Sequence, residues 1–105
     1  DLKILLMGDA GIEVEKNIIK KYNLNNISLL KVGHHGSKTS TSKEFIEVVN
    51  PKFSIISVGR NNSYGHPHSE VIQNLKKSNV YRTDQMGSIM FKMKNKKLTI
   101  ETYKP

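Results

Sequence analysis

The chain has 105 residues, no cysteine and a formal net charge of +8, from 17 Lys and Arg against 9 Asp and Glu. This length suits one small domain with a modest core, and the lack of cysteine excludes disulfides and thiolate metal sites. No apolar run approaches the roughly 18 residues that cross a bilayer. The basic balance favours phosphate backbones as partners, although a merely solvated basic surface has the same composition.

The first residues carry no signal-peptide pattern, because Asp1-Leu2-Lys3 leads directly into a strand-like run. This opening predicts that the chain is a piece of something longer. The dense apolar run at 2–7 is typical of a strand buried on both faces, and Gly8 stops it.

Further strand-like and helix-like segments alternate along the rest of the chain. Apolar spacing of three or four predicts a helix over residues 12–22, with Val14, Ile18, Ile19 and Tyr22 on one face. Thr41 and Glu44 match a capping box for a second helix, and Pro67 marks the start of a third. The remaining strands are expected at 27–32, 53–58 and 79–82, followed by a hairpin of 88–93 and 98–103. This order predicts right-handed crossovers and a mostly parallel sheet that ends in an antiparallel hairpin.

Polar residues gather in the loops that follow the first three predicted strands. These loops are Gly8-Asp9-Ala10, the segment 33–37 and the segment 61–68. In parallel α/β proteins the loops after the strand C-termini open on one edge, where ligands bind. The sequence therefore places Asp9 and four histidines at a single candidate site.

Two readings stay open for the acidic and histidine residues of the first two loops. Asp9 is either the N-cap of the next helix or a metal ligand. His34 and His35 are adjacent, so in an extended segment only one of them readily enters a given site, while the other supports it or contacts substrate. Gly33 and Gly36 on either side allow close approach of backbone or ligand.

The hydroxyl-rich segment 37–42 leads into a helix N-terminus and includes Ser37, Lys38 and Ser40. Hydroxyls, backbone N–H groups and a helix dipole can hold a phosphate, but the same residue types also simply cap helices. In His66-Pro67-His68 one histidine points into the cleft, or both only shape the start of the helix.

At the end of the fourth strand, Arg82 either approaches an anionic substrate or pairs locally with Asp84.

Several segments taken together resemble the C-terminal metallo-β-lactamase domain of ComEC-type DNA-uptake proteins. The resemblance is collinear over roughly residues 2–92, and the HHGS and YGHP elements are its most specific parts. The matching segments are 5–10, 30–40, 56–59, 62–67, 81–84 and 87–89.

The resemblance implies a metal-dependent phosphodiesterase, a nuclease, with zinc or manganese as cofactor and up to two ions in the intact domain. Asp9 falls on the aspartate that bridges both ions. His34 falls best on the last histidine ligand, with His35 as the fallback. The resemblance also makes His66 a catalytic residue and places Tyr64 and the segment 37–40 against substrate, and Arg82 is the further residue that we expect there.

The family's HxHxDH motif and its following histidine ligand precede the Gly-Asp element, and neither occurs in this sequence. Residues 1–105 are therefore expected to form the second half of an αββα sandwich, a mixed sheet with flanking helices and a C-terminal hairpin. A hydrolytic site needs three or more protein ligands per metal. This chain alone is expected to bind metal weakly, to show no hydrolysis, and to expose a face that favours dimerisation.

Three functions follow as hypotheses. The first is half of a two-metal phosphodiesterase acting on DNA, single-stranded or duplex, within a bacterial membrane protein that this soluble domain joins only through the parent chain. The second is a non-catalytic DNA-binding module of the same channel. The third is a metallo-hydrolase of another ester.

Overall fold

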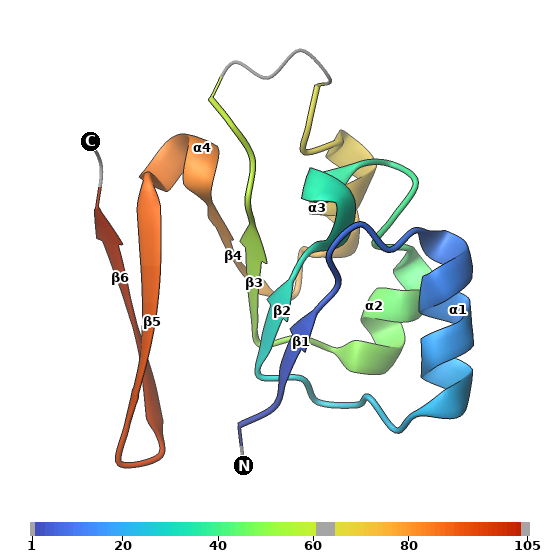
Figure 1. The fold of residues 1–105 in the computed structure, drawn as a ribbon, viewed down its shortest axis with the longest axis horizontal. Helices are drawn as coiled ribbons and strands as arrows, with labels where there is room; N and C mark the ends of the chain where they lie inside the picture. Colours follow the sequence, from blue (N-terminus) through green and yellow to red (C-terminus); the bar gives the residue numbers. More distant parts are fainter. Residues whose placement is uncertain (1, 61–64, 104–105) are drawn as a thin grey trace.

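The computed structural model describes residues 2–60 and 65–103, with the side chain of His34 left out. Four strands form a parallel sheet in the order in which they occur in the chain (Figure 1). They are β1 (Ile4–Leu6), β2 (Leu29–Lys31), β3 (Phe53–Ile56) and β4 (Asn79–Arg82). The α/β class and the parallel sheet expected from the sequence are confirmed.

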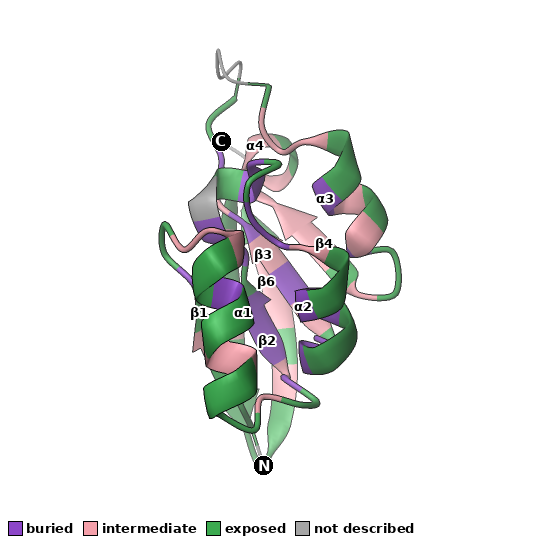
Figure 2. Cartoon of the chain, turned by 90° about the vertical axis from the view of Figure 1, so that its right-hand side faces the viewer, coloured by how far each residue is buried: buried purple, intermediate pink, exposed green. Residues whose placement is uncertain are grey.

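Three helices cover one face of this sheet, as Figures 1 and 2 show together. They are α1 (Ile12–Lys21), α2 (Lys43–Val49) and α3 (Ser69–Asn74). Side chains from the sheet and the helices form the core between them, with Leu30 of β2, Phe45 of α2 and Leu75 after α3 almost fully buried. Burial of this apolar surface holds the layers together.

The hairpin of β5 (Ser88–Lys94) and β6 (Lys97–Tyr103) packs on the opposite face of the sheet. Phe91 of β5 has its ring centroid 6.4 Å from that of Phe53 in β3 and 6.0 Å from that of Tyr81 in β4. The hairpin forms its own two-stranded sheet. The mixed sheet expected from the sequence is therefore two separate sheets, because the contact between them is made by side chains.

The apolar composition of β1 predicted a strand that is buried on both faces. This prediction is wrong, because β1 lies at the edge of the parallel sheet and only one of its faces is covered. Leu5 packs against the core, but Ile4 is 53% exposed and Leu6 is 69% exposed. These two side chains point to the face that carries the hairpin. The aromatic contacts of the hairpin are with β3 and β4, so the β1 end of this face stays uncovered.

Several local boundaries differ from the sequence-based expectation. Ser42, not Thr41, is the N-cap of α2, and its hydroxyl accepts from the N–H of Phe45. Helix α3 begins two residues after Pro67, and the short α4 (Thr83–Met86) was not expected. Among the described residues, no helix is long and apolar enough to cross a membrane.

Candidate functional site

The loops that follow β1 and β2 touch at the carboxyl edge of the parallel sheet. A Cβ atom placed on Gly33 would lie 3.1 Å from the carbonyl oxygen of Ala10 and 3.5 Å from that of Gly8. The backbone of the Gly8-Asp9-Ala10 turn therefore lies against the start of the 3-10 helix η1 (Gly33–Gly36). The expectation that these loops meet at one edge is confirmed for the backbone.

Asp9 is exposed at this edge and does not cap α1. The N-cap of α1 is Gly11, which makes no side-chain capping hydrogen bond. The capping alternative for Asp9 is therefore wrong. A carboxylate in this position keeps its oxygens available to a cation or to solvent.

His35 has a fixed ring orientation. Its Nδ1 lies 2.6 Å from the carbonyl oxygen of Ser57, in the segment after β3. A carbonyl only accepts, so Nδ1 carries the proton and Nε2 of the neutral ring holds a lone pair. Metal-bound histidines are commonly oriented by this kind of hydrogen bond.

His34 and His35 do not lie in an extended segment, although one was expected there from the sequence. Gly33–Gly36 forms a 3-10 helix, and His35 has a φ of 53°. The side chain of His34 lies outside the described part of the structure.

The loop before α3 packs directly on η1. A Cβ atom on Gly36 would lie 2.6 Å from Cβ of Pro67, and the N–H of His68 donates to the carbonyl oxygen of Gly36 at 2.8 Å. The peptide bond between His66 and Pro67 is cis. His68 is the N-cap of α3, with Nδ1 accepting from the N–H of Glu70 at 3.2 Å, so this histidine shapes the helix start. His66 is half-buried in the same loop.

The hydroxyls of the segment 37–42 bond mainly to their own loop. Ser40 Oγ lies 3.0 Å from the carbonyl oxygen of Gly33 and 3.1 Å from that of Ser37, and it is buried. Ser37 Oγ lies 3.0 Å from Thr39 Oγ1. Lys38 is exposed and lines, with Ser40, a hollow of about 260 Å³ that also contains Glu70.

A buried glutamate from α1 accepts hydrogen bonds from two backbone N–H groups of this segment. Glu15 is 1% exposed, and its carboxylate accepts from the N–H of Thr41 and, at 3.0 Å, from the N–H of Ser42. Those N–H groups would otherwise be the natural donors to a phosphate. An anion held by this segment therefore does not bind these two N–H groups while Glu15 accepts from them.

Sequence reasoning missed Glu15, although its spacing contained a signal. It lies three and four residues before Ile18 and Ile19, on the face of α1 that packs inward. Val14 and Tyr22, which the helical pattern placed on the buried face, are 46% and 56% exposed. A polar residue within an apolar stripe is the mark of a buried hydrogen-bond acceptor.

Arg82 and Asp84 pair with each other. The guanidinium Nε donates to Oδ1 at 3.0 Å and the terminal nitrogen donates to Oδ2 at 2.7 Å. The hydrogen bond from Arg82 lowers the pKa of the Asp84 carboxyl, against the opposing effect of burial. Of the two readings of Arg82, the structure shows the local pair.

The described residues do not form a complete metal site. No three His, Asp or Glu side chains within residues 2–60 and 65–103 form a group that could hold an ion. Asp9 and His35 offer one carboxylate and one oriented imidazole, which are donors that suit zinc or manganese. Tyr64 lies outside the described residues.

Fold and site define an α/β protein whose polar loops gather at the carboxyl edge of a parallel sheet. The chain is similar to ComE operon protein 3 of Bacillus subtilis (strain 168), with 45% identity over 103 residues, which are 96% of this chain and 13% of that protein. It is 40% identical over 100 residues to recombination protein 2 of Haemophilus influenzae, covering 93% of this chain and 12% of that protein. It is 37% identical over 92 residues to competence protein ComA of Neisseria gonorrhoeae, covering 84% of this chain and 13% of that protein.

The chain is similar to one segment of each of these three proteins, and the similarity covers most of the chain in every case. The chain spans about an eighth of the length of each of them. No family model matches the sequence. No solved structure matches it either.

Proposed function

We propose that the chain is the second half of a metallo-β-lactamase-fold domain in a competence protein, and that the intact domain is a metal-dependent phosphodiesterase acting on DNA. The observation that carries the proposal is the contact of three polar loops at one sheet edge. Gly33 packs on the turn that holds Asp9, and Gly36 packs on Pro67 beside His66. Ligand sites of α/β proteins lie at such edges.

In this proposal Asp9 and an imidazole of the histidine pair hold one or two zinc or manganese ions. The hydrogen bond of His35 to Ser57 supports His35 as the ligand, because it leaves Nε2 for the metal. His34 remains the alternative. When bound, such ions polarise a phosphoryl oxygen and lower the pKa of a bound water.

The remaining residues of the edge bind and orient the phosphodiester. His66 and Lys38 approach the phosphate from two loops, and the hydroxyls of Ser37 and Ser40 hold the loop that carries Lys38 in place. Tyr64 belongs to the same proposed substrate surface. Arg82 contributes only if its pair with Asp84 opens, so we assign it the weakest role.

The partner of this chain in the proposal is the preceding half of the same domain, within a membrane protein. The exposed Ile4 and Leu6 on the uncovered face of the sheet support this, because apolar side chains at an edge strand favour a covering layer. In this proposal the preceding half also brings the further metal ligands that hydrolysis needs. A homodimer of this chain is the competing way to cover the same face.

The decisive experiment measures DNA cleavage by the whole competence protein domain with zinc or manganese present. We expect Asp9→Asn to lower cleavage by at least about 100-fold and to weaken metal binding in calorimetric titration, since a ligand carboxylate is lost. Glu13→Gln, which neutralises an exposed acid in the first turn of α1, is the matched control and should cleave normally. Normal cleavage by Asp9→Asn would refute the proposal.

A non-catalytic DNA-binding module is the second candidate, and the net charge of +8 favours it. It predicts salt-dependent DNA binding that survives Asp9→Asn, with no metal-dependent cleavage by the whole domain. A metallo-hydrolase of another ester is distinguished by cleavage of that ester and not of DNA.

A further inference from the structure

Three adjoining hollows begin at the amino edge of the parallel sheet, opposite the candidate metal site, and the third extends along α2 to its first residue, Lys43. The first, of about 450 Å³, lies between the hairpin turn and β3 and is lined by Lys96, Lys52 and Phe53. The second, of about 390 Å³, has Lys52 and Lys77 in its lining. The third, of about 410 Å³, has Lys77, Lys76 and Lys43. We call these three adjoining hollows the lysine groove.

The hollows adjoin one another, because neighbouring hollows share lining residues. Lys52 and Ser28 line both the first and the second, and Lys77 and Asn50 line both the second and the third. Ser28, Lys52 and Ser78 each directly precede a strand of the parallel sheet. These three residues therefore lie at the amino ends of β2, β3 and β4, about one strand length, or 10–13 Å, from the carboxyl edge.

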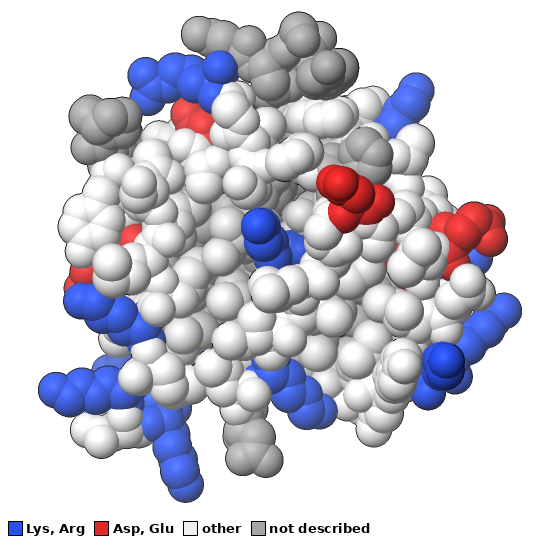
Figure 3. Space-filling model, viewed as in Figure 1, with Lys and Arg blue, Asp and Glu red and all other residues white. Residues whose placement is uncertain are grey.

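The charge of the groove is strongly one-sided. Five lysines line it, and Glu47 is the one carboxylate among the lining residues. Figure 3 shows Lys and Arg side chains along the edge that carries the hairpin turn and the N-terminus, while the visible Asp and Glu lie away from it. The field along this edge therefore attracts an extended anion.

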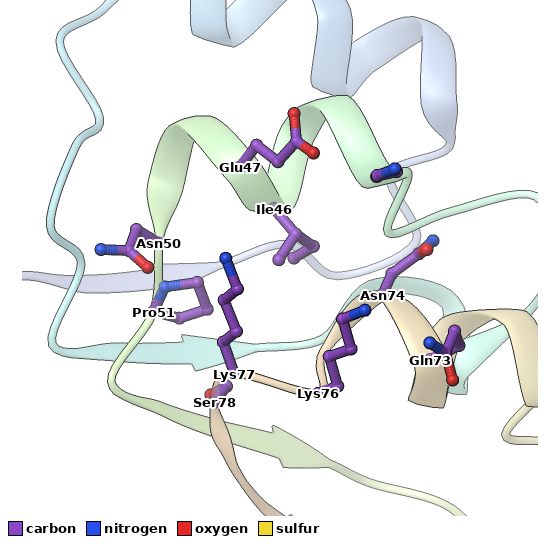
Figure 4. A pocket seen from close by; sticks show the side chains of 10 residues that line it. Ile46, Glu47, Asn50, Pro51, Gln73, Asn74, Lys76, Lys77 and Ser78 are labelled. Carbon is purple, nitrogen blue, oxygen red and sulfur yellow. The ribbon is translucent and has the colours of Figure 1, made fainter.

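Figure 4 shows how the lysines of the third hollow lie. Lys76 and Lys77 extend into it from the segment before β4, with Asn50 on one side and Asn74 on the other. The carboxylate of Glu47 points away from both amines. The amide groups add neutral hydrogen-bond donors beside the cations, which suits phosphate oxygens.

A structural role explains only part of this lysine arrangement. Lys76 and Lys77 follow the end of α3, where cations are favoured by the helix dipole. The helix dipole does not explain Lys96, which lies in the two-residue hairpin turn and has a φ of 62°. Glycine is favoured at such a position, so a lysine there keeps its charge at a conformational cost.

We propose that the lysine groove binds the backbone of a single nucleic-acid strand. A positively charged groove that follows the backbone is one of the features by which proteins hold single strands without reading sequence. The ring of Phe53 in the first hollow packs against Tyr81 and Phe91, and the amine of Lys52 lies 5.5 Å from its centroid, so the contacts to the strand in this hollow come from the lysines. An anionic membrane is the other extended anion to consider. A flat bilayer would contact the lysines at the rim but would not fill the hollows between them, so a single strand fits the groove better. The inference deepens the DNA partner of the proposed function, and it does not depend on the metal site.

The test measures binding of a labelled oligothymidine of roughly twelve nucleotides to the chain in EDTA, over a range of salt concentrations. Lys52→Gln with Lys77→Gln removes the two lysines that each line two hollows. Losing two phosphate contacts should lower the salt slope by about 1.4 and weaken binding about 25-fold at 0.1 M salt.

The matched control is Lys16→Gln with Lys92→Gln, which makes the same charge change at exposed positions that line none of the three hollows. We expect the control to bind within about threefold of the unaltered chain, because salt screens distant charges. Circular dichroism and urea unfolding establish that both variants are folded.

Two results overturn the inference. One is equal weakening by both variant pairs, which would mean that net charge alone attracts the oligonucleotide. The other is binding to vesicles of phosphatidylcholine and phosphatidylserine that depends on Lys52 and Lys77 while oligonucleotide binding does not. The binding test is done in EDTA and therefore does not involve metal. A negative binding result would overturn the lysine groove alone, whereas normal cleavage by Asp9→Asn would overturn the proposed function.

Discussion

Substituting alanine at Gly36 tests the contact that joins the loops of the candidate site. The new Cβ would lie 2.6 Å from Cβ and 3.0 Å from Cα of Pro67, and 3.4 Å from Cγ2 of Ile56. Carbon atoms in contact are ordinarily about 3.5–4.0 Å apart, so the two loops must separate by about 1 Å. The proline ring and the two backbones leave no flexible side chain to yield.

Two separate costs add at this position. Gly36 has a φ of 78°, and a left-handed conformation costs a residue with a Cβ roughly 1–2 kcal/mol. Overpacking against Pro67 costs about 1–3 kcal/mol more. We therefore expect Gly36→Ala to lower the free energy of unfolding by about 2–5 kcal/mol. This is a large share of the roughly 5–15 kcal/mol that stabilises a small domain.

Two other glycines separate these costs in a urea-unfolding series. Gly8 has a φ of 58° and nothing within 4 Å of its ideal Cβ, so Gly8→Ala should show only the conformational cost of about 1–2 kcal/mol. Gly59 has open space and no such φ, so Gly59→Ala should change stability by no more than about 0.5 kcal/mol. Equal losses for Gly36→Ala and Gly8→Ala would refute the loop contact.

Two further predictions concern carboxylates. Glu15→Gln should lower the free energy of unfolding, measured in urea, by about 2–3 kcal/mol, because one oxygen that accepts from Thr41 or Ser42 is replaced by an NH₂ donor. A loss of stability no larger than that caused by Glu13→Gln at an exposed position would contradict this prediction. Arg82 lowers the pKa of Asp84 below 3.8, so its ionised form stabilises the fold above about pH 4, and this contribution disappears as the pH falls through the lowered pKa. Unfolding midpoints should therefore fall more steeply below pH 4 in the unaltered chain than in Asp84→Asn, and parallel curves would exclude the pair as the cause.

Much of the architecture could be predicted because it depends on local patterns. The bounds of β4 at Asn79–Arg82 match the expected strand, and the hairpin follows from alternation around a polar turn. The meeting of the loops after β1 and β2 follows from parallel strands alone. These features need no knowledge of which side chains touch.

The remaining features depend on tertiary contacts that composition does not encode. The apolar run at β1 is equally compatible with an edge and a central strand, so the exposure of Leu6 could not be read from it. Arg82 and Asp84 are two residues apart, and only coordinates decide between a local pair and a free cation. The anchoring of His35 on Ser57 joins residues 22 apart through a main-chain oxygen, which leaves no mark on the sequence.

The strand order β1-β2-β3-β4 has a consequence for synthesis on the ribosome. Each parallel strand has its predecessor in the chain as its neighbour, so none must wait for a segment translated later. Short sequence separation between partners keeps the loop-closure entropy of each docking step small. The hairpin, whose two strands pair with each other, can form within microseconds of emerging and then dock as a unit through Phe91.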